Sequence, residues 1–149
     1  MPLKSNELSN FDMLKILKSQ NIKIIGIYMK DELPSKLKQG FYIVNLASEK
    51  DKNGGTHWLS FYYTPNKSFY FDPYGELVPL EIDNKIRPYI YNMKQIQDYN
   101  STACGYYCMA FIIYMNEFKN KLNGFFKLIN LFSTNTKEND KLLYKLLYD

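Results

Sequence analysis

One histidine and two cysteines are the residues of this chain best suited to covalent chemistry. The histidine is His57, and the cysteines are Cys104 and Cys108. A cysteine thiolate is a strong nucleophile, and a neighbouring imidazole can take up its proton and favour the charged pair. We expect Cys104, which is followed by Gly105 and a long apolar stretch, to begin a helix, where the helix dipole favours a thiolate. Because the chain has no second histidine, any imidazole chemistry depends on His57.

A carboxylate and an amide complete the set of groups that an acyl transfer needs. Asp72 ends the strand that follows the one beginning at His57, so a hairpin would bring both side chains to one edge of a sheet. A carboxylate bonded to an imidazole fixes its tautomer and orientation. The developing oxyanion also needs hydrogen-bond donors. Gln97, seven residues before Cys104, supplies a side-chain amide, and the backbone N–H of Cys104 is a second donor; Gln95 is the alternative amide.

Each of these residues also has an ordinary structural explanation when it is taken alone. A single histidine at a strand end commonly lies on the surface or in the core, and Asp before Pro commonly forms a turn. A cysteine inside an apolar helix is usually a small buried hydrophobe, which is our interpretation of Cys108. The catalytic interpretation therefore depends on the joint arrangement of the four positions.

The cysteine count also bears on metals and on the redox compartment. A zinc site takes about four ligands, and two cysteines with one histidine are too few, so we predict no metal. Two cysteines four residues apart on a helix have poor geometry for a disulfide. We therefore expect both thiols to be reduced and the compartment to be a reducing one.

Length and composition predict one domain that spans residues 1–149. The chain is 46% hydrophobic and 17% aromatic, which excludes a disordered protein. No apolar run approaches the about 20 residues of a membrane span, and the polar, lysine-containing start does not resemble a signal peptide. We therefore expect a protein that is neither secreted nor membrane-bound. The formal charge of +4 allows at most a weak attraction to polyanions such as DNA, and a solvated surface explains it as well.

The order of apolar patterns predicts an α+β fold, with a mostly antiparallel (mixed) central sheet packed against helices. Residues 41–47 are almost continuously apolar, which predicts a strand buried on both faces. We expect Ser9 or Asn10 to cap the first helix, Asn100 or Ser101 to cap the helix that begins at Cys104, and Gly124 to end that helix region. The predicted helices span residues 11–18, 104–122, 125–132 and 137–148, with one helical turn at 34–40 and a short irregular or helical piece at 80–91; the predicted strands span 23–29, 41–47, 57–63, 68–72 and 92–97.

Three separated motifs resemble those of the adenain-like cysteine proteases, the adenovirus maturation proteases. These motifs are GGTHW at residues 54–58, FDPYG at residues 71–75, and Gln97 followed after six residues by Cys104 and Gly105. The segment NSTACGYYCMAF at residues 100–111 is similar to the nucleophile segment of that family along its whole length. Similar proteases are encoded by virophages and polinton-like viral elements. The likeness extends from the first helix to about Met115.

The resemblance implies a papain-like arrangement and a role for each of several residues. It makes Cys104 the nucleophile, His57 the general base, Asp72 the orienting acid and Gln97 the oxyanion donor. It also implies an endopeptidase that trims viral capsid or core precursors, in the virion and in the host-cell cytoplasm or nucleus where virions assemble. Small residues, Gly or Ala, would flank the scissile bond. Residues that would bind substrate are Trp58, whose indole can roof a narrow channel beside the base, with Gly55 and Gly105.

The same resemblance suggests two activating partners and leaves two other functions open. Members of the family are activated by a peptide that forms a disulfide and by DNA; here a disulfide-linked peptide is not expected, because no cysteine lies outside residues 104–108. We expect a monomer that requires no cofactor. A protease for ubiquitin-like modifiers, from the same clan, is one alternative. A non-catalytic module that stacks single-stranded nucleic acid on aromatic strands is the other, although those strands lack interleaved basic residues.

Substitution of each cysteine should separate their roles. We expect Cys104→Ala to abolish peptide cleavage and alkylation by a thiol reagent at neutral pH, whereas Cys108→Ala, one turn farther into the helix, should leave both nearly unchanged. Mass spectrometry of the alkylated chain identifies the modified residue. Equal losses in the two variants would contradict the assignment.

Overall fold

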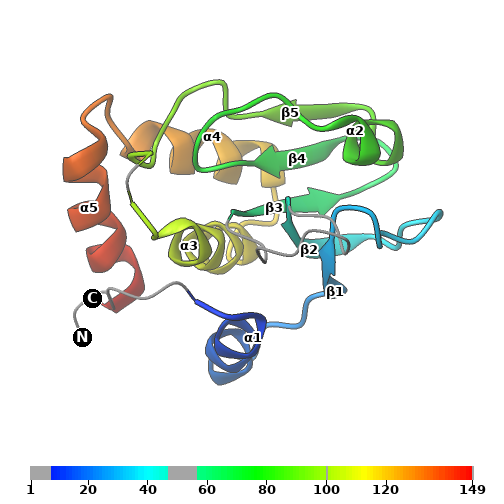
Figure 1. The fold of residues 1–149 in the computed structure, drawn as a ribbon, viewed down its shortest axis with the longest axis horizontal. Coiled ribbons are helices and arrows are strands. Elements are labelled where there is room, and N and C mark those ends of the chain that lie inside the picture. Colours follow the sequence, from blue (N-terminus) through cyan, green and yellow to red (C-terminus); the bar gives the residue numbers. More distant parts are fainter. Residues whose placement is uncertain (1–7, 47–56, 100, 149) are drawn as a thin grey trace.

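Five strands form a mixed sheet at the centre of the computed structural model, which describes residues 8–46, 57–99 and 101–148 (Figure 1). Their spatial order follows the chain. The middle three strands are antiparallel, whereas each edge strand runs parallel to its neighbour, so the expected mixed sheet is confirmed but antiparallel pairs do not predominate. The strands are β1 (Gly26–Met29), β2 (Gly40–Asn45), β3 (Trp58–Tyr63), β4 (Ser68–Phe71) and β5 (Tyr89–Tyr91).

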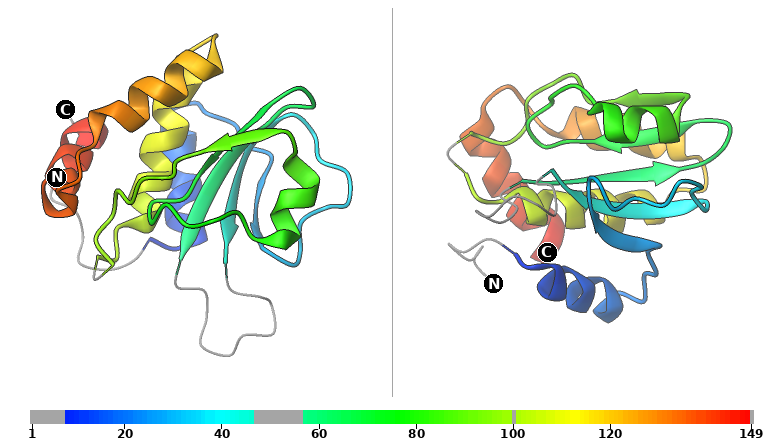
Figure 2. Two further views of the ribbon diagram at one scale, coloured as in Figure 1. Left: turned by 90° about the horizontal axis from the view of Figure 1, so that it is seen from above. Right: turned by 45° about the vertical axis from the view of Figure 1, so that its right-hand side comes forward.

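Helices cover both faces of this sheet, and the described residues form one α+β domain (Figures 1 and 2). The helix α2 packs on one face, over a smaller apolar cluster that includes Leu59 and Phe61 of β3. The other four helices lie on the opposite face, where Trp58 and Tyr62 of the same strand pack against a larger cluster. The helices are α1 (Asn10–Ser19), α2 (Leu80–Ile86), α3 (Cys104–Asn116), α4 (Lys121–Leu131) and α5 (Thr136–Tyr148).

The helix α3 lies at the centre of the larger cluster. Its first nine residues, Cys104 to Ile112, are all buried, because the sheet covers one side and α1, α4 and α5 contact the others. A helix that is apolar around its whole circumference is stable only when it is enclosed in this way. The start of α3, and with it the thiol of Cys104, is therefore held by packing on several sides. None of the helices in the described part of the chain is long and apolar enough to cross a membrane.

Several predicted elements are confirmed. The capping box of α1 has Ser9 accepting from the Asp12 N–H while the Asp12 carboxylate accepts from the Ser9 N–H. The strand β2 is buried on both faces, as its apolar sequence predicts, and α3 begins at Cys104. The predicted end of this strand at Ala47 lies outside the described residues.

Other predictions are wrong, and long-range hydrogen bonds explain the clearest case. Residues 92–97 form no strand, because the N–H groups of Ile96 and Gln97 both donate to the Pro73 carbonyl and the Asn92 side chain binds the backbone of Asp72. The fifth strand instead comprises residues 89–91, beside β4. Residues 34–40 contain no helical turn, and β1 starts three residues later than predicted.

The helix boundaries after α3 also differ from the prediction. The helix α3 ends at Asn116, and Asn120 caps a new helix, α4. Gly124, which was expected to end the helix that begins at Cys104, lies inside α4 instead. A Cβ at Gly124 would lie 2.9 Å from the Phe118 ring, so this glycine permits close packing. At the start of α3, Ser101 accepts from the N–H of Ala103, the residue directly before the helix, and Asn100 lies outside the described residues.

Gly75 joins the turn after β4 to the segment that leads to α3. Its φ of +70° is in the left-handed region, and a Cβ there would lie 2.7 Å from the backbone of Lys94. Asn21 has a similar φ of 57° but is exposed. Since the left-handed conformation alone costs about 1–2 kcal/mol, we expect Gly75→Ala to reduce the free energy of unfolding clearly more than Asn21→Ala does. Urea denaturation measures the free energy of unfolding of both variants. Equal losses would contradict the close approach of Gly75 to the Lys94 backbone.

Candidate active site

The ends of two paired strands bring His57 and Asp72 together. His57 directly precedes β3, Asp72 directly follows β4, and these strands are antiparallel, so both residues reach the same edge of the sheet. The imidazole Nε2 lies 2.6 Å from Asp72 Oδ1, and both side chains are buried. The predicted hairpin therefore places the pair as expected. Asn92 holds the backbone of Asp72 through two hydrogen bonds, to its N–H and its carbonyl.

The charged neighbours of His57 change its protonation. Burial by itself lowers the pKa of His57. The hydrogen bond to Asp72 and the neighbouring Cys104 thiol raise the pKa by more than burial lowers it, so that the pKa rises from 6.5 to about 9. The imidazole is therefore protonated at neutral pH. Because Nε2 is directed at Asp72, the other ring nitrogen, Nδ1, is the one that can serve a nucleophile. It is buried and has no hydrogen bond of ordinary geometry within the described part of the chain.

Cys104 lies beside the residue that follows the histidine. The backbone N–H of Trp58 donates to Cys104 Sγ at 3.5 Å, so the start of α3 contacts the start of β3. The thiol is 1% exposed and forms no disulfide. Cys108 is fully buried one turn farther along, and burial raises its pKa well above the ordinary value, which makes it a poor nucleophile. The burial of Cys108 agrees with its interpretation as a small buried hydrophobe, and the role of Cys104 as the nucleophile stays a prediction.

Gln97 is completely buried next to the segment that enters α3. Its Nε2 donates to the Ser101 carbonyl at 2.8 Å, and its Oε1 has no hydrogen-bond partner among the residues that the structure describes. An amide nitrogen carries two hydrogens, so one remains for a further acceptor. Gln95, the alternative donor, directs its amide at the Gln97 carbonyl and so helps to hold this segment.

The last helix holds the same segment from its other side, which the sequence analysis did not foresee. Asn139 Nδ2 donates to the Ile96 carbonyl at 2.9 Å, and the Ser101 hydroxyl donates to Asp140 at 3.2 Å. Asp140 also accepts a 2.6 Å hydrogen bond from Tyr107 of α3. Two polar residues near the start of an amphipathic helix carry no distinctive signal, so only the folded chain reveals this connection.

The other predicted site residues occupy different surroundings. Trp58 is half-buried, and its indole packs against the larger core cluster. Gly105 is buried where a Cβ would lie 3.0 Å from Leu8, so it allows the segment before α1 to pack closely on α3. Gly55 lies outside the described residues. Contact of these three residues with substrate stays a prediction.

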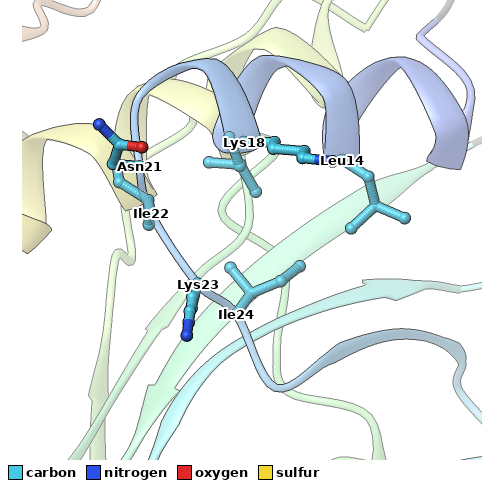
Figure 3. A pocket seen from close by; sticks show the side chains of 7 residues that line it. Leu14, Lys18, Asn21, Ile22, Lys23 and Ile24 are labelled. Carbon is cyan, nitrogen blue, oxygen red and sulfur yellow. The ribbon is translucent and has the colours of Figure 1, made fainter.

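A pocket of about 490 Å³ lies elsewhere, between α1 and the segment before β1 (Figure 3). Leu14 and Ile24 lie on opposite sides of it, and its other lining residues are Leu17, Lys18, Asn21, Ile22 and Lys23. This pocket contains none of the predicted site residues, and its lining offers neither a nucleophile nor a carboxylate. Among the described residues, no three His, Cys, Asp or Glu side chains form a group that could hold a metal ion.

The stability of the chain should depend on pH through the His57–Asp72 pair. Because the pKa of His57 rises to about 9 on folding, the stabilisation is complete below about pH 6.5 and is lost as the pH rises through about 9. We expect Asp72→Asn to remove most of this pH-dependent part of the free energy of unfolding, which is about 3 kcal/mol at most. The free energy of unfolding, measured by urea denaturation across this pH range, tests it.

A matched control is Asp83→Asn, which removes a carboxylate paired with Arg87 far from the histidine. The difference in free energy of unfolding between this variant and the wild type should stay constant from pH 6.5 to 9. Tyr89 and Arg87 lower the pKa of Asp83, so this carboxylate stays ionised throughout that pH range. If the difference between the wild type and Asp72→Asn were equally constant, the charged pair would be contradicted.

Comparison with known proteins supplies no relative for this chain. No model of a protein family matches the sequence, and no curated protein matches it. The functional argument depends on the geometry around His57, Asp72, Gln97 and Cys104.

Proposed function

We propose that this chain is a cysteine endopeptidase with a papain-like arrangement of its catalytic groups. The observation that carries the proposal is the position of His57, bound through Nε2 to Asp72 while Cys104 lies beside it at the start of a helix. A buried, protonated imidazole next to a thiol is the arrangement that stabilises a reactive thiolate. A buried structural histidine would also need a partner such as Asp72, so the thiol beside the pair is the feature that favours catalysis.

Each group has one task in the proposed reaction. The Cys104 thiolate attacks the carbonyl carbon of the scissile peptide bond, and the carbonyl electrons move onto its oxygen. That oxyanion receives hydrogen bonds from the second Nε2 hydrogen of Gln97 and from the backbone N–H of Cys104. His57 then gives its proton to the leaving amine as the C–N bond breaks. In the second stage, neutral His57 takes a proton from water, the resulting hydroxide attacks the thioester, and the Cys104 thiolate leaves.

Asp72 acts on the histidine throughout this cycle. Its carboxylate holds Nε2, which keeps the imidazole in one orientation and directs Nδ1 at the thiol. It also stabilises the imidazolium that must persist until the leaving amine is protonated. Asp72 therefore sets the proton affinity of the base without touching the substrate.

For the substrate we propose viral capsid or core precursors, cleaved beside Gly or Ala during assembly. The motif resemblance supports this class, and Trp58, whose backbone N–H binds Cys104 Sγ, adjoins the proposed nucleophile in sequence and in space. Fluorogenic peptides with Gly or Ala on both sides of the scissile bond test the proposal against peptides with Leu or Phe there. Cleavage of the first set alone, lost in Cys104→Ala, is the expected result. Cleavage of modifier fusions but no peptide would instead favour the modifier-specific alternative.

Removal of the Gln97 amide should affect turnover alone. We expect Gln97→Ala to lower kcat about 10²–10³-fold with little change in KM or in the pH profile, because the amide binds only the transition-state oxyanion. Gln95→Ala is the control and should lose far less. If Gln95→Ala lost activity while Gln97→Ala kept it, the oxyanion donor would be the other amide.

A further inference from the structure

A tyrosine of the FDPYG motif, Tyr74, to which the sequence analysis assigned no role, is stacked on the candidate base. The ring of Tyr74 lies nearly parallel to the His57 imidazole, with 4.2 Å between ring centroids and 16° between planes. The sequence analysis includes this residue only as part of the FDPYG motif. In the folded chain the same turn carries its side chain over the imidazole.

Tyr74 also contacts two other parts of the site. Its backbone N–H donates to Asp72 Oδ1 at 2.8 Å, the same oxygen that binds the imidazole. Its hydroxyl lies 3.4 Å from the Ser101 carbonyl, which also accepts from the Gln97 amide. One residue thus joins the base, the carboxylate and the segment of the oxyanion donor.

The geometry of these three contacts indicates which of them lets the Tyr74 side chain influence His57. At 3.4 Å the hydroxyl contact is long for an O–H donor, so it contributes little. The backbone bond to Asp72 does not depend on the side chain. Stacking is different, because an aromatic face within about 6 Å attracts a cation, and His57 is an imidazolium at neutral pH. The ring also blocks rotation of the imidazole away from the plane that serves both Asp72 and Cys104.

We propose that Tyr74 is a positioning residue for the catalytic base, acting through the stacking of its ring on the imidazole of His57. The inference rests on the proposed function, since it assigns a task within that active site. It predicts that the ring, rather than the hydroxyl, is required. The groups that set the charge of the imidazole are Asp72 and Cys104, and Tyr74 adds to them without a charge of its own.

Proton NMR of the wild-type chain gives the first test, because the only histidine makes the imidazole signals unambiguous. Stacking under a tyrosine face should shift the two imidazole C–H signals upfield of those in the unfolded chain. Tyr74→Phe should keep this shift, and Tyr74→Leu should abolish it. Imidazole signals at unfolded-chain positions in the folded wild type would overturn the proposal without any variant.

The second test separates positioning from general stability. We expect Tyr74→Leu to lower the His57 pKa by about 0.5–1 unit and to reduce kcat about 10–100-fold with KM almost unchanged, while Tyr74→Phe stays close to the wild type. The matched control is Tyr99→Leu. It removes an exposed ring whose centroid lies 5.1 Å from that of Tyr74 but which is not stacked on the imidazole. That control should keep both the His57 pKa and kcat.

The outcomes distinguish this inference from the proposed function. A folded Tyr74→Leu with unchanged His57 titration and kcat would overturn the positioning role, whatever the wild type cleaves. A wild type with upfield imidazole signals that cleaves no peptide and is not alkylated at Cys104 would overturn the proposed function and leave the stacking in place. If Tyr74→Leu does not fold, the wild-type and Tyr74→Phe spectra still decide whether the ring lies on the imidazole.

Discussion

The hydrogen bond between the His57 imidazole and the Asp72 carboxylate joins the two strand ends on which the candidate active site is built. A buried carboxylate and a buried imidazolium are each costly to remove from water, so neither would be stable there without the other. Their pairing fixes which ring nitrogen remains for chemistry and raises the pKa of His57 to about 9. The register of β3 and β4 and the turn at Gly75 are therefore constraints on chemistry as well as on the fold.

The proposed nucleophile, Cys104, lies beside this pair because the start of α3 is enclosed on all sides. Its first residue, Cys104, contacts the backbone at the start of β3, and its position is held by α1, α4, α5 and the sheet. The segment that precedes α3 is fixed separately: Asn139 and Asp140 of α5 bind the backbone of Ile96 and the hydroxyl of Ser101. The amide of Gln97 lies between those anchors. Groups from the two halves of the chain are thus brought together by packing and by side-chain hydrogen bonds, which allows a small domain to preorganise several catalytic groups.

The local signals in the sequence predict those parts of the site that depend on local structure. The hairpin carrying His57 and Asp72 follows from strand and turn patterns, and the helix beginning at Cys104 follows from the long apolar stretch after that residue. The course of residues 92–97 does not, because its backbone bonds go to Pro73 and to the Asn92 side chain rather than to a neighbouring strand. The stacking of Tyr74 and the anchoring by Asn139 escape prediction for the same reason. They depend on contacts between segments distant in sequence, for which no residue type is diagnostic.

The central claim is that His57 is a charged base held between Asp72 and Cys104. The most direct test is a nitrogen-15 NMR titration of the imidazole in the native wild-type chain, where the single histidine removes any ambiguity of assignment. The account predicts an imidazole that keeps both ring protons through neutral pH and titrates near pH 9, with the Nε2 proton in a short hydrogen bond. A histidine that titrates near its ordinary value of 6.5, with no strongly hydrogen-bonded ring proton, would contradict it.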